Sequence, residues 1–257
     1  MRELAARSYF ALCLTAGRLL RSATYSTVRM RAHENGEPVV RKRRRVYAPL
    51  LIWMNELLAA ILKPGVRVLP QREWEERERR INLSLRGASI EVDADGMLVL
   101  PRLTGQTLAG LLEDPGSKPP VRRRAIERAV VALADFHRLG FTHGDAMAEN
   151  VLVDLEADVA HWFDFETRHE ENRPLAWRRA DDVRALLVTC LVRTAPGQRA
   201  DTFELILTAY ADEDVTRAVA TFFTSVWRRS LTYDLVQAHL SYACFRDIGR
   251  LFRERYT

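Results

Sequence analysis

Lysine is scarce in this chain. Arginine and lysine together number 39 among 257 residues, yet lysine occurs only at Lys42, Lys63 and Lys118. The formal net charge of +5 therefore comes almost wholly from arginine, as an arginine-rich codon usage would produce. Any chemistry that requires a lysine consequently has only these three candidates.

Cysteine is also rare. The three cysteines, Cys13, Cys190 and Cys244, are far apart and form no CxxC pair. An odd number of scattered cysteines fits reduced thiols better than a disulfide framework or a zinc site. This usage favours an intracellular, cytoplasmic protein.

Long hydrophobic runs are missing as well. The longest, residues 46–62, is interrupted by Asn55 and Glu56 and is too short to span a bilayer comfortably. The apolar stretch 9–16 lacks a clear cleavage site, which argues against a secretory signal. We therefore expect no transmembrane helix.

The first hundred residues alternate between helical and strand patterns. Residues 2–21 resemble a basic helix, and two strand-like runs, 27–33 and 38–46, flank an Asn-Gly pair that favours a hairpin turn. An apolar helix is expected at 49–62, and a highly charged helix from 71 to 86 should end at Gly87.

A second hairpin and a change of pattern follow. Strands are expected at 89–92 and 97–100 around Asp95-Gly96, and the chain becomes largely helical after a Pro-rich break at 115–120. This is an α+β pattern with two lobes. We predict an N-terminal helix (1–21), a β-rich lobe (22–103) and a helical lobe (104–257).

Three polar residues in the stretch 133–166 carry the chemistry. A helix that stops at Gly140 is followed by His143-Gly144-Asp145, then by Asn150, a short strand, and Asp164 in a Phe-Asp-Phe-Glu run. Phosphoryl transfer from ATP needs a carboxylate to orient the acceptor hydroxyl and hard oxygen ligands for Mg²⁺. Asp145, Asn150 and Asp164 have these properties; the alternative is that the two aspartates only cap turns.

The pattern HGDxxxxN followed by a hydrophobic residue and DFE resembles the catalytic loop and metal motif of the protein-kinase-like superfamily. The HGD form is similar to aminoglycoside phosphotransferases, the small atypical kinases of the tRNA-modification complex and lipopolysaccharide-core (Kdo/heptose) kinases. The resemblance implies a two-lobed kinase-like fold, with ATP and Mg²⁺ (or Mn²⁺) as cofactors. It implies that Asp145 is the catalytic base, that Asn150 and Asp164 are metal ligands, and that His143 braces the loop.

The resemblance also implies a lysine on a strand and a glutamate on a helix. Lys42 is the only strand lysine and would grip the nucleotide phosphates; the alternative is an exposed basic edge. On the helix 71–86, Glu78 falls nearest the apolar face of Trp74, Ile81 and Leu85. A buried acid requires a cationic partner, so Glu78 is predicted to pair with Lys42, and Glu75 is the second choice.

Two further segments match the same pattern. Residues 97–108 resemble the last strand of the first lobe and the hinge, so Pro101, Arg102 and Leu103 are expected to meet the adenine edge. Asp182, or its neighbour Asp181, is expected to anchor the backbone of the catalytic loop from a long helix.

Some features depart from the pattern. No glycine lies between Gly17 and Gly36, so a glycine-rich phosphate loop is missing, and 22–26 would have to cover the phosphates. Only a short segment separates Glu166 from Asp182, which leaves little room for an activation loop. The alternatives are therefore an atypical Ser/Thr protein kinase, a catalytically silent pseudokinase scaffold and a membrane-peripheral adaptor.

The acceptor is expected to be a small molecule, with a sugar or glycolipid near the membrane favoured. The basic run 41–45 precedes the apolar helix 49–62, a combination suited to anionic lipid at the inner face of the membrane. The alternative is that this helix only packs on the sheet. No nucleic-acid partner is expected, because only the mild basic balance would favour one.

Overall fold

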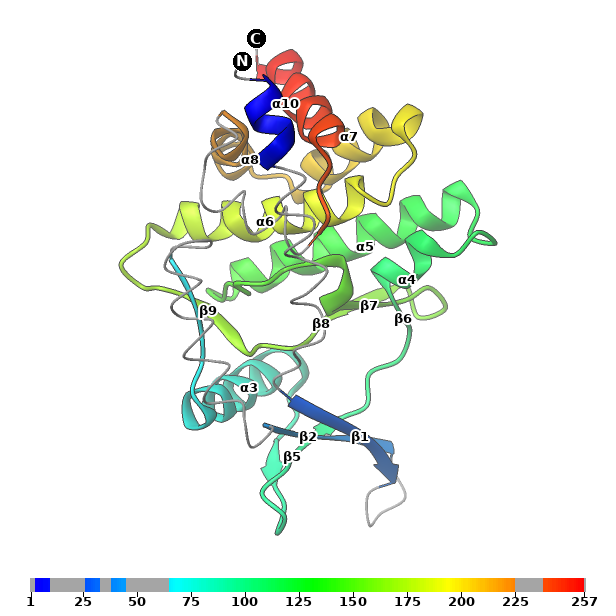
Figure 1. Cartoon of the computed structure of the whole chain (residues 1–257). Helices are drawn as coiled ribbons and strands as arrows, with labels where there is room; N and C mark the ends of the chain where they lie inside the picture. Colours follow the sequence, from blue (N-terminus) through cyan, green and yellow to red (C-terminus); the bar gives the residue numbers. More distant parts are fainter. Residues whose placement is uncertain (1–2, 10–25, 33–37, 45–64, 225–237, 257) are drawn as a thin grey trace.

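The computed structural model describes residues 3–9, 26–32, 38–44, 65–224 and 238–256. A small β-rich lobe forms the lower part of Figure 1, and a larger helical lobe forms the upper part. The predicted α+β, two-lobed architecture is confirmed. The predicted helix 49–62, and most of the segment 22–26, lie outside the described residues.

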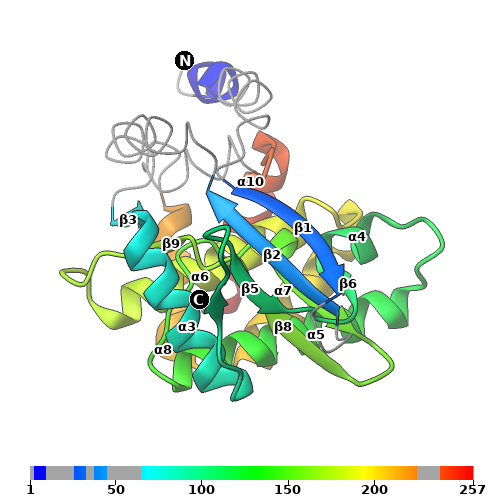
Figure 2. The same cartoon turned by 90° about the horizontal axis from the view of Figure 1, so that it is seen from below.

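The small lobe is built on one antiparallel sheet, whose strand order is β1-β2-β5-β4 (Figure 2). Its strands are β1 (Ser26–Ala32), β2 (Pro38–Arg44), β4 (Glu91–Val92) and β5 (Leu98–Pro101). Lys42 lies opposite Val28 on one side and Leu98 on the other. It is therefore held in an internal strand, and both predicted hairpins are confirmed.

Helix α3 (Gln71–Arg86) lies beside this sheet and has the predicted bounds. It ends because Gly87 adopts φ 62°, a left-handed conformation that glycine accepts without cost from a side chain. Trp74 is fully buried and packs in a small core with Leu69, Ile90 and Leu98. This core attaches the charged helix to the sheet.

A two-stranded pairing joins the lobes and was not predicted from the sequence. β3 (Val66–Val68), just before α3, pairs antiparallel with β9 (Thr167–His169), just after the Asp-Phe-Glu run. The Leu69 N–H continues this ladder by donating to the Glu166 carbonyl oxygen over 2.8 Å. The start of α3 is therefore held to the segment that carries Asp164.

The large lobe is centred on two long helices, α5 (Pro119–Arg138) and α6 (Leu175–Leu191), which cross the middle of Figure 1. Pro119 and Pro120 begin α5, since proline lacks only an N–H that the first turn does not use. A continuous apolar core lies between these two helices and the shorter ones around them. The surrounding helices are α4 (Leu108–Glu113), α7 (Arg199–Tyr210), α8 (Glu213–Ala220) and α10 (Tyr242–Tyr256).

The first residues of the chain lie against its last helix. Residues 3–9 are helical, and Glu3 pairs with Arg246 of α10 at 3.4 Å (Figure 1). The rest of the predicted helix 2–21 is outside the described residues. Among the helices that the structure describes, none has the length and apolar character needed to cross a bilayer.

Candidate functional site

The loop that carries Asp145 and Asn150 is closed by hydrogen bonds within itself. It leads through a 3₁₀ turn, η1 (Ala148–Asn150), into β7 (Val151–Asp154), which pairs with β8 (Val159–Trp162) and β6 (Gln106–Thr107). The Asn150 amide nitrogen donates to the Asp145 backbone oxygen (2.8 Å) and carboxylate (3.1 Å). The Phe163 N–H donates to the Asn150 carbonyl oxygen over 3.1 Å, which brings Asp164 beside the loop.

Asp182 holds the backbone of this loop from α6. Its carboxylate accepts the N–H groups of His143 (2.7 Å) and Gly144 (2.8 Å), and His137 Nε2 lies 3.0 Å away. Burial acts to raise the pKa of Asp182, but the nearby histidines, chiefly His169 and His137, act to lower it. The net result is a pKa of about 2. Of the two aspartates considered from the sequence, Asp182 is therefore the anchor.

Asp181 has different partners. Its carboxylate accepts from Arg184 (2.8 Å) and lies 3.2 Å from His169 Nε2. Both aspartates are fully buried. They have different partners because their side chains leave α6 in different directions.

His143 braces the loop, as the resemblance implied. Its Nδ1 lies 3.3 Å from the Asp145 N–H and accepts from it, so its Nε2 carries the proton that is donated to the Phe163 carbonyl oxygen at 3.0 Å. Burial lowers the pKa of His143, which favours this neutral form. One imidazole thus joins the Asp145 loop to the segment before Asp164.

Asp164 has a backbone conformation that is uncommon for a residue with a side chain. Its φ is +67°, a value that costs energy outside glycine and that often marks a functional site. Desolvation raises the pKa of its carboxyl group, but the Lys42 ammonium, together with His143 and Glu166, lowers it, and the net direction is downward. Asp164 therefore remains ionised beside Lys42.

Lys42 is buried, which contradicts the alternative of an exposed basic edge. Its ammonium contacts the Asp164 carboxylate and lies 2.7 Å from Glu166 Oε1. Desolvation alone would lower its pKa, but Asp164, Glu166 and Glu78 together raise it, so Lys42 stays protonated. The ion pairs of Lys42 in the described part of the chain are thus with Asp164 and Glu166, and the predicted pair with Glu78 is wrong.

Glu78 is the buried glutamate of α3, as the helical pattern predicted, but its carboxylate is occupied elsewhere. It accepts from Trp74 Nε1 (3.1 Å), Asn82 Nδ2 (3.2 Å) and the Phe165 N–H (3.3 Å). Glu75, the second choice, interacts with Gln71 along the helix. Glu78 therefore fixes the backbone of the Asp-Phe-Glu run and acts on Lys42 only through its charge.

A cleft of about 610 Å³ lies between the lobes and is lined by Lys42, Glu78, Asp164 and Glu166, whereas Asp145 and Asn150 are not among its lining residues. Val28 and Val40 line it from the sheet, and Leu152 lines it from the large lobe. Most of the predicted nucleotide residues border it as well: Lys42, Pro101, Arg102, Leu103 and Asp164. Apolar walls with a few charged groups are typical of a site for a flat, partly apolar ligand.

The predicted hinge residues contribute backbone groups to this cleft. Pro101 has no N–H, and the Arg102 N–H donates to the Pro38 carbonyl oxygen over 3.4 Å. Leu103 also borders the cleft, and within the described part of the chain no hydrogen bond of its N–H is found, so this N–H can meet the edge of a base. The position of the segment therefore suits the predicted contact.

The donor atoms at Asn150 and Asp164 suit a hard divalent cation. The Asn150 nitrogen is used by Asp145, so its amide oxygen is the atom left for a cation, and Asp164 supplies a carboxylate. Within the described ranges, no three His, Cys, Asp or Glu side chains group into a metal site.

Several residues at the site were missed from the sequence alone. Glu166 and Arg44 form an ion pair of 2.7 Å beside Lys42, and Arg86 of α3 lines the cleft and donates to the Trp162 carbonyl oxygen. Arg44 could have been found from its spacing, because residues two apart on a strand share a face. Arg86 follows Glu78 by eight residues, about two helical turns.

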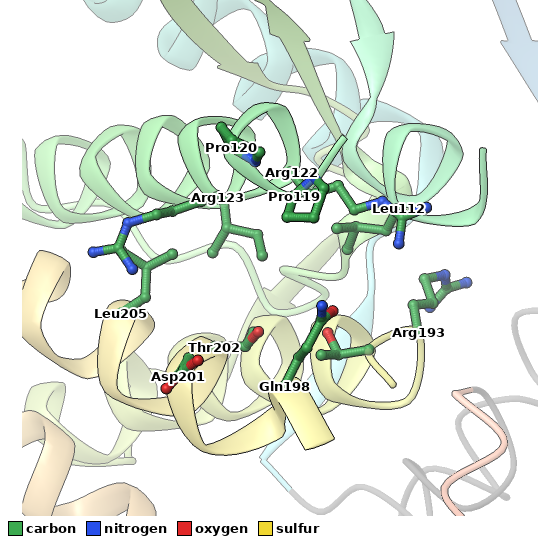
Figure 3. Close-up of a pocket in the computed structure, with 12 residues that line it drawn as sticks. Leu112, Pro119, Pro120, Arg122, Arg123, Arg193, Gln198, Asp201, Thr202 and Leu205 are labelled. Atoms are coloured by element: carbon green, nitrogen blue, oxygen red, sulfur yellow. The ribbon is translucent and has the colours of Figure 1, made fainter. Parts of the chain in front are cut away.

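A second pocket, of about 310 Å³, lies between the first turns of α5 and α7 (Figure 3). Arg122, Arg123 and Arg193 line it, with Asp201 across the pocket. Arg193 is already engaged by Glu113 (2.8 Å) and Glu149 (2.5 Å). None of the predicted site residues borders this pocket, so the cleft is the candidate site.

Comparisons with known proteins agree with this geometry. Residues 89–210, just under half of the chain, match the model of the lipopolysaccharide kinase (Kdo/WaaP) family, which supports a kinase-type phosphotransferase. No curated protein matches the chain significantly.

Among solved structures, 144 chains match. One is described as "Crystal structure of Rad53 1-466 in complex with AMP-PNP"; it is 15% identical, with a TM-score of 0.37. The alignment covers 90% of this chain and 57% of the length of that one. The resemblance inferred from the motifs is confirmed: over residues 89–210 the chain is similar to the lipopolysaccharide kinase (Kdo/WaaP) family.

Proposed function

We propose that this protein is an ATP- and Mg²⁺-dependent kinase that transfers the γ-phosphate to a hydroxyl group of a sugar or glycolipid. The observation that carries the proposal is the cleft in which a buried Lys42 meets Asp164, beside the Asp145–Asn150 loop. A buried lysine, a carboxylate and an amide oxygen are the groups that phosphoryl transfer requires.

Each residue has a role in this proposal. Lys42 binds the nucleotide phosphates, and Asn150 and Asp164 hold the cation, which when bound neutralises charge on the phosphates. The adenine ring of the nucleotide lies between Val28, Val40 and Leu152, with its edge at residues 101–103. Asp145 orients the acceptor hydroxyl and accepts its proton.

The acceptor class rests on the family match, since that family is described by its action on lipopolysaccharide. The apolar helix that also favoured a membrane glycolipid lies outside the described residues, whereas residues 41–44 of the basic run lie in β2. There Arg41 pairs with Asp93, and Lys42 and Arg44 pair with Glu166, so these three side chains are engaged within the protein. A contact of the helix 49–62 with the inner face of the membrane remains a prediction from the sequence.

The first test is a thermal-shift titration with ATP, with and without Mg²⁺, of the wild-type chain and of Asp164→Ala. We expect ATP to raise the melting temperature only with Mg²⁺, and Asp164→Ala to lose most of the effect because it lacks a ligand. Asp201→Asn, an exposed aspartate outside the cleft, is the matched control and should respond as wild type does. No response of the wild type to nucleotide would contradict the proposal and favour the pseudokinase scaffold.

Transfer itself is tested with γ-labelled ATP and a membrane glycolipid extract. Asp145→Asn should retain the ATP-dependent stabilisation but reduce transfer by roughly a hundredfold or more, because the hydroxyl loses its base. Labelling of protein in place of glycolipid would favour the atypical protein kinase.

A further inference from the structure

Lys42 is shared between two carboxylates that differ in what else they must do. Its ammonium contacts Asp164 and lies 2.7 Å from Glu166 Oε1. Asp164 is the proposed cation ligand, whereas Glu166 has no such role. The side chain of Asp164 is 38% exposed, and that of Glu166 is only 9% exposed.

Glu166 is itself held in place by Arg44. Arg44 Nη1 lies 2.7 Å from Glu166 Oε2, so a different cation occupies each carboxylate oxygen. Arg44 also donates to the Leu69 carbonyl oxygen over 3.0 Å. A carboxylate with two charge-assisted contacts is strongly oriented.

The Trp74 ring lies close to both cations, Lys42 and Arg44. The Lys42 ammonium lies 5.2 Å from the centre of the Trp74 ring, and the Arg44 guanidinium lies 5.0 Å from it. These distances are within the range of attraction between a cation and an aromatic face. The two cations therefore lie side by side on one buried surface, with Glu166 between them.

Glu78 is not free to take the place of Glu166. Three donors already use its carboxylate, from Trp74, Asn82 and the Phe165 backbone. Glu78 thus positions the backbone of the metal motif, and the Lys42 ammonium needs another carboxylate as its partner.

We propose that Glu166 is the positioning residue for Lys42: it holds the ammonium toward the nucleotide phosphates and keeps Asp164 available to the divalent cation. Without Glu166, the ammonium has Asp164 as its remaining ion-pair partner in the described part of the chain, and the two compete for the same carboxylate. This inference rests on the proposed function of the cleft. It predicts that loss of Glu166 changes the Mg²⁺ requirement more than it changes the fold.

The test compares Glu166→Gln with Glu171→Gln, by measuring the Mg²⁺ concentration that half-saturates the ATP-dependent thermal shift. Glu166→Gln should raise this midpoint by about tenfold, because Lys42 then competes with Mg²⁺ for Asp164. The nucleotide-free melting temperature, measured in the same experiment, reports separately on the fold. Glu171→Gln, an exposed change in the same segment, should alter neither value.

Two controls keep the outcomes separate. If Glu166→Gln does not fold, Arg44→Gln/Glu166→Gln also removes the guanidinium that pairs with Glu166, and it should show the same rise in the Mg²⁺ midpoint. A midpoint near the wild-type value in the Glu166 variants, or an equal rise in Glu171→Gln, overturns the inference while ATP binding stands. A wild-type protein that does not respond to ATP and Mg²⁺ overturns the proposed function, and this inference with it.

Discussion

At the scale of single residues, Asp182 has the most concentrated set of contacts near the site. It accepts two backbone N–H groups from the His143-Gly144 pair and lies within hydrogen-bonding distance of His137. An asparagine at this position keeps the shape but offers one acceptor oxygen and adds an NH₂ group that faces donors. The carboxylate is therefore needed for its charge and for both of its oxygens.

Asp182→Asn should lower the free energy of unfolding by roughly 3 kcal/mol, because a buried network loses an acceptor and a charge. Urea denaturation measures this value. Asp201→Asn, at an exposed site on α7, should change it by less than about 0.5 kcal/mol. Equal stability of the two variants would show that the loop does not depend on Asp182.

At the scale of elements, the connection between the lobes passes through a glycine that has no room for a side chain. Gly105 has φ +102°, and a Cβ there would lie 2.4 Å from the Val153 carbonyl oxygen. The next residues form β6, which pairs with β7 beside the catalytic loop. The close approach of these two backbones therefore sets the position of the hinge.

Gly105→Ala should cost roughly 2–4 kcal/mol of unfolding free energy, and the ATP-dependent thermal shift should shrink, because β6 must move away from β7. The matched control is Gly96→Ala, at φ +70° in the second hairpin, where a Cβ meets nothing within 4 Å. That change should cost only about 1 kcal/mol, the price of the left-handed conformation alone. Similar losses in the two variants would rule out the steric explanation.

Helix α3 is bound to the large lobe as well as to the sheet. The β3–β9 ladder holds its start, Arg77 donates to the Thr142 carbonyl oxygen, and Arg86 donates to the Trp162 carbonyl oxygen. Glu78 adds a contact to the metal motif from the same helix. Contacts along the whole length of the helix therefore join it to the large lobe and to the metal motif.

At the scale of the whole molecule, two buried groups make the folded state sensitive to acid. Burial lowers the pKa of His143, so its contribution is complete above the ordinary histidine value and is lost as the pH falls toward the folded value. The pKa of Asp182 is about 2, below an unfolded value of about 3.9. Its contribution is therefore present above about pH 4 and is lost as the pH falls toward 2.

We expect the unfolding free energy to fall in two stages on acidification, first below about pH 6.5 and again between about pH 4 and pH 2. The second stage should amount to roughly 2 kcal/mol from Asp182. Urea denaturation across this pH range measures both stages. Asp182→Asn should show a second stage that is smaller by this amount, because Asp164, whose pKa is also lowered, still contributes. A wild-type protein whose stability is constant from pH 7 to about 3 would contradict the prediction.

The sequence by itself determined the local elements and the residues with reactive groups. The hairpins, the bounds of α3 and the loop that joins Asp145 to Asn150 depend on turn residues, apolar periodicity and short-range hydrogen bonds. Such features involve residues close together in the chain, so a pattern in the sequence can reveal them. The burial of Glu78 was predictable for the same reason.

The tertiary structure decided which charged groups meet. Lys42 pairs with Glu166 rather than Glu78, and Asp182 rather than Asp181 holds the catalytic loop. The β3–β9 pairing brings the Asp-Phe-Glu run to the start of α3 across about a hundred residues, a separation at which no periodicity applies. Charged groups on different elements meet only when the lobes are packed. For this reason, the sequence could not predict which carboxylate pairs with which cation.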